Sequence, residues 1–248
     1  RHDSLGVADG VGGWEGVKNA NPALFSRKLM HYSYIEVEKY ENIEDYEFVH
    51  YYDINPVDIL RKSYTQVLED AYVEGIRGSS TACLAILRDD ELRVANLGDC
   101  GLAVVRRGEF VFRTEEQQHS FNFPYQIGTG CADRPEDAQV FAFKVQRGDI
   151  ILVGSDGLFD NLFDEDILEE IQRYVPQPTT PATPSPPTLP PEAIARRAKS
   201  VSEESRFTTS PFQNRAMQEG FYHQGGKPDD ITVLIAVVAD LEDSPDRR

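Results

Sequence analysis

The chain has 248 residues, 40% of them hydrophobic, a composition typical of a globular protein with one sizeable core. Its 42 acidic side chains outnumber the 25 basic ones, and the formal net charge of -17 argues against a general affinity for nucleic acid or anionic membrane surfaces. No apolar run reaches the roughly 20 residues of a membrane-spanning helix.

The first half of the chain predicts two amphipathic helices. Apolar residues recur at helical spacing over residues 22–40 and again over residues 56–74, and each stretch has a proline in its first turn. The acidic and aromatic segment between them, residues 41–55, is interpreted as a surface connection.

From Gly78 onward, short apolar or alternating runs predict strands in an antiparallel meander. The runs are SSTACLAIL, ELRVANLGD, GLAVVRRG and EFVFRT, and AQVFAFKVQRGDIILVGSDG adds two strands joined by a turn at Arg147 and Gly148. Cys83, Cys100 and Cys131 lack the CxxC spacing of a zinc or redox site, so we expect buried apolar thiols.

The last third predicts a helix over residues 164–174 with Asp164 as a cap, helical patterning over residues 192–205, and a strand over residues 231–239. Proline and threonine alternate so densely over residues 176–191 that we expect a disordered loop within a domain. The element order indicates an α+β layered fold. We expect one domain over residues 1–240 and a polar tail at 241–248.

Several aspartates stand where apolar strands meet turns marked by glycine or proline. They are Asp9 in VADG, Asp99 in NLGDCG, Asp156 in VGSDG, and Asp229 with Asp230 in GGKPDDITVLI. A carboxylate buried at a strand end is costly unless a metal, an arginine or another cation offsets its charge. Carboxylates gathered at one rim of a sheet suit Mg²⁺ or Mn²⁺. Each aspartate is also an ordinary turn residue, so both interpretations stay open on these residues alone.

The sequence does not match the patterns of several other catalytic sites. The sequence has no GxxxxGK loop and no GxSxG elbow, and its five histidines are scattered without the spacing of a zinc helix. His119, in EEQQHSFN, is the one histidine that we single out as a candidate functional residue.

These motifs together resemble the metal-dependent Ser/Thr protein phosphatases of type 2C, the PPM family. VADGVGGW, GSSTACLAIL, ANLGDCG, GSDGLFDN and GGKPDDITVLI stand in the family's order. The similarity extends from Leu5 to Ala239 apart from the Pro/Thr segment. It is especially close to the mitochondrial branch of the family, which also carries EQQH.

The resemblance implies a central antiparallel β-sandwich flanked by helices, in four layers, with two Mn²⁺ or Mg²⁺ ions at one end of the sheets. In this family pattern Asp9 bridges both metals, the carbonyl of Gly10 ligates one of them, and Asp156 and Asp229 hold the second. Asp99 matches the position of a weaker third ion. Asp230 is interpreted as an orienting neighbour, because many members have asparagine there.

The implied reaction is hydrolysis of phosphoserine and phosphothreonine in proteins by a metal-activated water, without a phosphoenzyme. Many members have a histidine that protonates the leaving oxygen where this chain has Val11, so His119 or a metal-bound water is the candidate acid. The mitochondrial branch shares this valine. The family's first acidic ligand and its phosphate-binding basic residue come from an upstream strand, which we expect to precede Arg1.

The alternative hypothesis is a pseudophosphatase that keeps the fold and binds phosphoproteins as a scaffold. Val11 and the lack of the upstream strand in this sequence favour it, whereas the retained carboxylates disfavour it, because clustered carboxylates without a metal repel one another. We expect a monomer that acts on phosphoproteins, without nucleic acid or a membrane span. The location is mitochondrial by resemblance alone and is otherwise expected to be intracellular.

Overall fold

The computed structural model describes residues 3–40, 51–174, 191–205 and 208–240. It divides into two compact units, of which the first holds residues 1–100 and 115–144 and the second holds residues 101–114 and 145–248. The Pro/Thr segment up to residue 190, residues 41–50 of the predicted connection, and the polar tail all lie outside the described residues.

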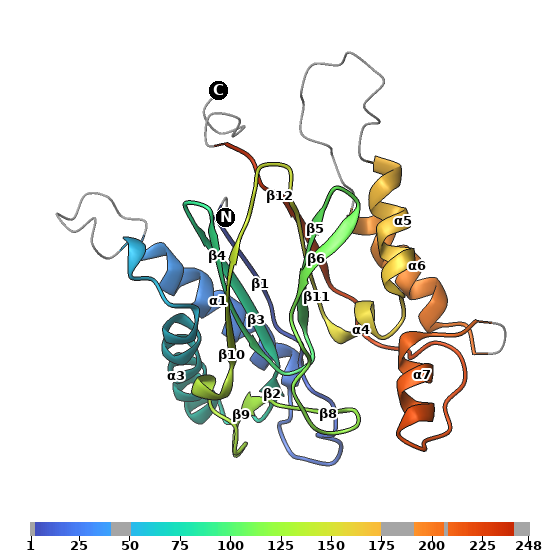
Figure 1. The fold of residues 1–248 in the computed structure, drawn as a ribbon. Coiled ribbons are helices and arrows are strands. Elements are labelled where there is room, and N and C mark those ends of the chain that lie inside the picture. Colours follow the sequence, from blue (N-terminus) through green and yellow to red (C-terminus); the bar gives the residue numbers. More distant parts are fainter. Residues whose placement is uncertain (1–2, 41–50, 175–190, 206–207, 241–248) are drawn as a thin grey trace. The chain divides into compact units, whose positions relative to one another are not determined.

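The first unit is built on a four-stranded antiparallel sheet (Figure 1). Its strand order is β1-β3-β4-β10, with bounds Ser4–Val7, Ala82–Arg88, Glu91–Leu97 and Gln139–Lys144. Two short antiparallel pairs accompany it: β2 (Ser79–Ser80) with β9 (Ile127–Gly128), and β7 (Gln118–Ser120) with β8 (Phe123–Pro124). A 3₁₀ turn at Pro135–Asp137 precedes β10.

Two helices of the first unit, α1 (Pro22–Glu38) and α3 (Pro56–Glu74), pack against each other, and α3 also packs on β3 and β4. The Asn21 and Asn55 side chains cap them by accepting from backbone N–H groups at 2.9 Å, and Gly75 ends α3 in the left-handed conformation at φ 67°. The prediction of a helix over residues 56–74 is confirmed, and the first helix ends two residues earlier than predicted.

The second unit has its own four-stranded antiparallel sheet, in the order β12-β11-β5-β6 (Figure 1). The strand bounds are Val233–Val237, Ile150–Gly154, Gly101–Arg106 and Glu109–Arg113. Its helices are α4 (Asp156–Phe159), α5 (Asp164–Tyr174), α6 (Pro191–Ser202) and α7 (Pro211–Gln218). Helix α6 contacts β12, α4 and α5, and an apolar cluster that includes Leu152, Leu158, Ile167 and Ile194 is buried among these elements.

The fold class is therefore confirmed as mixed α+β with antiparallel sheets. Among the described residues, none of the helices is both long enough and apolar enough to cross a bilayer.

Three predictions are wrong in detail. The predicted meander is two hairpins, β3–β4 and β5–β6, that belong to different sheets, because the turn at Gly98 ends the pairing of β4 before β5 begins. Asp164 lies inside the first turn of α5 rather than at its cap, and it forms an ion pair with Arg113. Within the predicted surface connection, Ile54 is buried in the apolar core of the first unit.

The cysteines are free thiols, and Cys83 and Cys100 are buried as predicted. Burial raises the pKa of Cys83 to about 12, so this thiol stays neutral and behaves as an apolar side chain. Cys131, in the loop that follows β9, is only half-buried, which differs from the prediction.

A buried ion pair in the second unit makes a prediction about stability. Arg106 donates from Nε and Nη2 to the two carboxylate oxygens of Asp149 at 2.8 and 2.7 Å, and Asp149 is 1% exposed. Substitution Asp149→Asn removes the charge and one acceptor, so we expect the free energy of unfolding in urea to fall by about 2 kcal/mol.

The matched control is Asp240→Asn, which breaks the ion pair with Arg147, whose two side chains are each 59% exposed. This exposed pair is screened by water, and its loss is expected to change the free energy of unfolding by less than about 0.5 kcal/mol. Equal effects of the two substitutions would contradict the assignment of a stabilising role to Asp149.

Candidate metal centre

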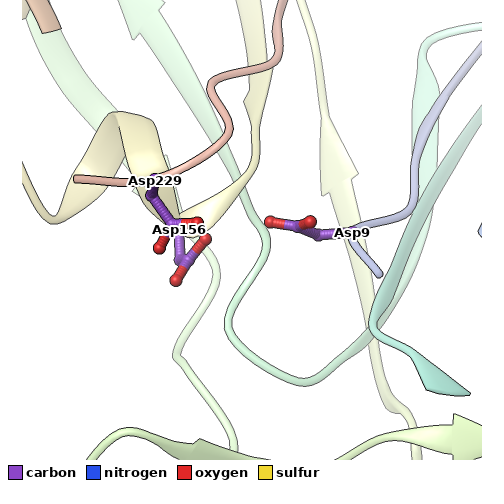
Figure 2. A group of neighbouring side chains, drawn as sticks. All are labelled: Asp9, Asp156 and Asp229. Atoms are coloured by element: carbon purple, nitrogen blue, oxygen red, sulfur yellow. The ribbon is translucent and has the colours of Figure 1, made fainter. Parts of the chain in front are cut away.

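In the second unit, two predicted ligands are brought together at adjacent strand ends. Asp156 begins α4 directly after β11, and Asp229 lies in the segment that leads into β12, the neighbour of β11 in the sheet. Each offers a carboxylate oxygen, and these two oxygens lie within 4.8 Å of each other. Figure 2 shows the two side chains next to each other at this junction.

Hydrogen bonds between the Ser155 hydroxyl and backbone groups of the segment before β12 fix this junction. Ser155 accepts from the N–H of Thr232 at 3.1 Å and donates from its hydroxyl to the carbonyl of Asp230 at 3.1 Å. Gly157 is required at the start of α4, because a Cβ there would lie 2.3 Å from the carbonyl oxygen of Asp230. The chain can therefore place Asp156 beside Asp229 only with a glycine at this position.

The surroundings of Asp229 disfavour the charged form of its carboxylate. Burial, with the charge of Asp156, raises the pKa of Asp229 above its ordinary value. Hard oxygen donors that repel each other at this separation are the donor set that Mn²⁺ and Mg²⁺ prefer, so these residues fit a divalent cation.

Lys227 is a functional candidate that the sequence patterns did not indicate. Its ammonium donates to Asp156 at 2.5 Å and to Asp160 at 2.7 Å, and it lies 3.0 Å from Asp229. Burial alone would lower the pKa of Lys227, but Asp160 and Asp156 outweigh that effect and raise it, so the side chain is charged. Asp160 could have been found from the sequence, because it follows Asp156 by four residues, a spacing that places two side chains on the same face of a helix.

In the first unit, Asp9 follows β1 with its backbone pinned by the segment around β2. Its carbonyl accepts from the N–H of Thr81 and the hydroxyl of Ser80, each at 2.9 Å. Gly10 lies against the start of α1, where a Cβ would come within 2.7 Å of Pro22 backbone atoms. The side chain of Asp9 extends from this strand end in Figure 2.

Asp99 lies in the turn after β4 and is 6% exposed. Burial raises the pKa of the Cys100 thiol, and the charges of Asp9 and Asp99 add to this effect, so both carboxylates act on the same part of the first unit. The backbone N–H of Asp230 donates to a carboxylate oxygen of Asp229 at 2.9 Å, and an orienting role for the Asp230 side chain stays a prediction.

His119 lies on β7 in the first unit and is held on two sides. Its Nε2 is 3.0 Å from each carboxylate oxygen of Asp133, and its ring stacks on Tyr125 with centroids 4.0 Å apart. Because an ionised carboxylate only accepts hydrogen bonds, Nε2 carries the proton in this contact.

Curated proteins match nearly the whole chain, although no protein-family model matches it. The chain is 40% identical over 257 residues to the protein phosphatase PTC7 homolog of Xenopus laevis, covering 97% of this chain and 78% of that protein. It is 39% identical to the probable protein phosphatase 2C 80 of Arabidopsis thaliana, covering 95% of this chain and 51% of the plant protein, so it spans about half that relative's length.

Solved structures of protein phosphatases share the fold of this chain. The X-ray structure of the photosystem II phosphatase PBCP superimposes with a TM-score of 0.75 at 32% identity, covering 95% of this chain and 87% of that chain. The catalytic domain of the serine/threonine phosphatase PstP, described in complex with 2 manganese ions, shares the fold with a TM-score of 0.59 at 19% identity, covering 96% of this chain and 88% of that chain.

These matches define the chain as a protein phosphatase. It belongs to the protein phosphatase 2C family, the metal-dependent serine/threonine phosphatases whose motifs its sequence resembles.

Proposed function

We propose that this chain hydrolyses phosphoserine and phosphothreonine esters in proteins, and that Asp9, Asp156 and Asp229 hold two divalent cations, Mn²⁺ or Mg²⁺, for the reaction. The carbonyl of Gly10 is proposed as a further ligand, and Asp99 as a ligand of a weaker third ion. The observation that carries the proposal is the convergence of Asp156 and Asp229, whose carboxylate oxygens lie within 4.8 Å of each other at two neighbouring strand ends.

When bound, such cations would activate a water molecule and neutralise the negative charge of the phosphoryl group during its transfer. The chain's own contribution is positioning. The hydrogen bonds of Ser80 and Thr81 to the backbone of Asp9 hold the first proposed ligand on a sheet edge. The hydrogen bonds of Ser155 to Asp230 and Thr232 hold the second and third proposed ligands beside the ends of the neighbouring strands β11 and β12. Rigid strand ends keep carboxylates in place better than free loops do.

His119 is the proposed general acid for the leaving serine or threonine oxygen. Asp133 orients its ring through Nε2, and in the doubly protonated ring Nδ1–H is the group that would give its proton to the leaving oxygen, which leaves the neutral imidazole with its remaining proton on Nε2. Aryl phosphates have leaving groups that need less protonation, so they depend less on this residue.

The proposed substrates are phosphorylated proteins, and the proposed location is the mitochondrion. The substrates rest on the relatives, which are named as protein phosphatases and include the PTC7 homologs of frog and human. The location rests on the resemblance of the sequence to the mitochondrial branch of the family.

The test is hydrolysis of an aryl phosphate and of a phosphothreonine peptide by the full chain, with Mn²⁺ and then with excess chelator. We expect both substrates to be hydrolysed with Mn²⁺, the aryl phosphate faster, and both activities to disappear in chelator. A chain that binds the phosphopeptide but hydrolyses neither substrate at any Mn²⁺ concentration would overturn the proposal in favour of the pseudophosphatase alternative.

A further inference from the structure

The second unit gathers one buried and two partly buried carboxylates around one lysine. The side chains of Asp156 and Asp160 are 13% and 5% exposed, and that of Lys227, which contacts both, is 15% exposed. Asp229 adds a third carboxylate at 3.0 Å from the same ammonium. The remaining oxygen of Asp160 is paired with Arg215. Carboxylates in such a group are costly unless each is paired.

Lys227 is fixed in this position by its backbone as well as by its charge. Its N–H donates to Oδ1 of Asn161 at 2.8 Å, and Nδ2 of Asn161 donates back to its carbonyl at 3.0 Å. Asn161 is 1% exposed, and it also donates to the carbonyl of Gly157 at 2.9 Å. The ammonium also lies 5.1 Å from the centroid of the Phe212 ring. Lys227 is therefore held in a defined position by its surroundings.

We propose that Lys227 is a built-in counter-cation of the metal centre, which stabilises the metal-free fold and weakens the binding of the divalent ion at Asp156 and Asp229. This inference rests on the proposed function, because it takes these two aspartates as metal ligands. In this proposal Lys227 acts through the charges of the two aspartates and not by contact with the substrate.

Both halves of the proposal follow from Coulomb's law. Without the ammonium, three carboxylates share a poorly hydrated space with Arg215 as the neighbouring cation, and their mutual repulsion destabilises the folded state. With the ammonium in place, a divalent ion that binds the same carboxylates experiences the repulsion of a fixed positive charge. Removing Lys227 therefore affects folding and metal affinity in opposite directions, whereas simple damage to the structure would weaken both.

The test compares Lys227→Met in the full chain with the wild type and with Lys199→Met, a control that removes an exposed lysine paired with Glu203 on the same unit. We expect the melting temperature of Lys227→Met in chelator to fall by about 5 °C or more. We also expect its Kd for Mn²⁺, measured by isothermal titration calorimetry, to decrease by about tenfold or more. Because a tighter ligand stabilises more, Mn²⁺ should then raise the melting temperature of the variant more than that of the wild type.

A Kd for Mn²⁺ that is unchanged or weaker in Lys227→Met, or an unchanged melting temperature in chelator, would overturn the inference. If Lys227→Met does not fold in chelator, the double variant Lys227→Met with Asp160→Asn removes one charge of each sign and is expected to fold again. Failure of this rescue would also overturn the inference. A wild type that binds Mn²⁺ but hydrolyses no phosphoester would overturn the proposed function and leave the counter-cation intact.

Discussion

Substitution Asp156→Asn is expected to lower kcat/KM for aryl phosphate hydrolysis with Mn²⁺ by about a thousandfold, which corresponds to about 4 kcal/mol of lost transition-state stabilisation. The amide keeps the shape of the side chain but removes its charge and replaces one oxygen by a group that cannot ligate a metal. Initial rates over a range of Mn²⁺ concentrations measure the effect. A deficit that saturating Mn²⁺ partly restores is expected, because the substitution weakens metal binding.

The control for this experiment is Asp240→Asn, which makes the same chemical change at an exposed ion pair of the same unit. It should retain the wild-type rate. Near-ultraviolet circular dichroism of both variants verifies that the fold is kept, since a misfolded Asp156→Asn would lose activity for another reason. An Asp156→Asn variant that is folded and retains more than about a tenth of the wild-type kcat/KM would contradict the role of Asp156 as a ligand.

The helices of the first unit could be predicted closely because local chemistry specifies their ends. Asn55 with Pro56 begins α3, and Gly75 ends it with a backbone conformation that glycine adopts without strain. These signals act within a few residues, so they are visible in the sequence.

The assignment of strands to sheets could not be predicted in the same way. The turn at Gly98 looks like any hairpin turn, yet the strands on its two sides belong to different sheets. A strand's partner is decided by long-range packing, and the apolar residues of β4 and β5 are the same whichever sheet receives these strands. The predicted meander failed for this reason.

The same division holds at the candidate site. The aspartates could be predicted from the sequence as carboxylates that stand beside apolar strands. Their position in the chain places them at the ends of those strands. Lys227 was not visible, because a lysine in a loop is usually solvated and nothing local indicates that its ammonium reaches Asp156 and Asp160. The charge balance of the site therefore required the structure.

Substitution Gly157→Ala is expected to lower the free energy of unfolding by about 2–3 kcal/mol and to weaken Mn²⁺ binding by about tenfold or more. The new methyl group would lie 2.3 Å from the carbonyl oxygen of Asp230 and 3.1 Å from its carbonyl carbon, so the backbone that carries Asp229 has to move away from α4. This displacement separates Asp229 from Asp156 without changing either ligand. Urea denaturation in chelator measures the first effect, and calorimetric titration with Mn²⁺ measures the second.

Gly12→Ala is the matched control, because a Cβ at Gly12 would meet no atom within 4 Å. Its free energy of unfolding should differ from that of the wild type by less than about 0.5 kcal/mol, with unchanged Mn²⁺ affinity. If Gly157→Ala loses stability but binds Mn²⁺ as tightly as the wild type, the spacing of Asp156 and Asp229 does not determine metal binding. The metal would then have to be held by other residues, because a backbone shift of this kind changes the distance between these two carboxylates before it changes any other part of the site.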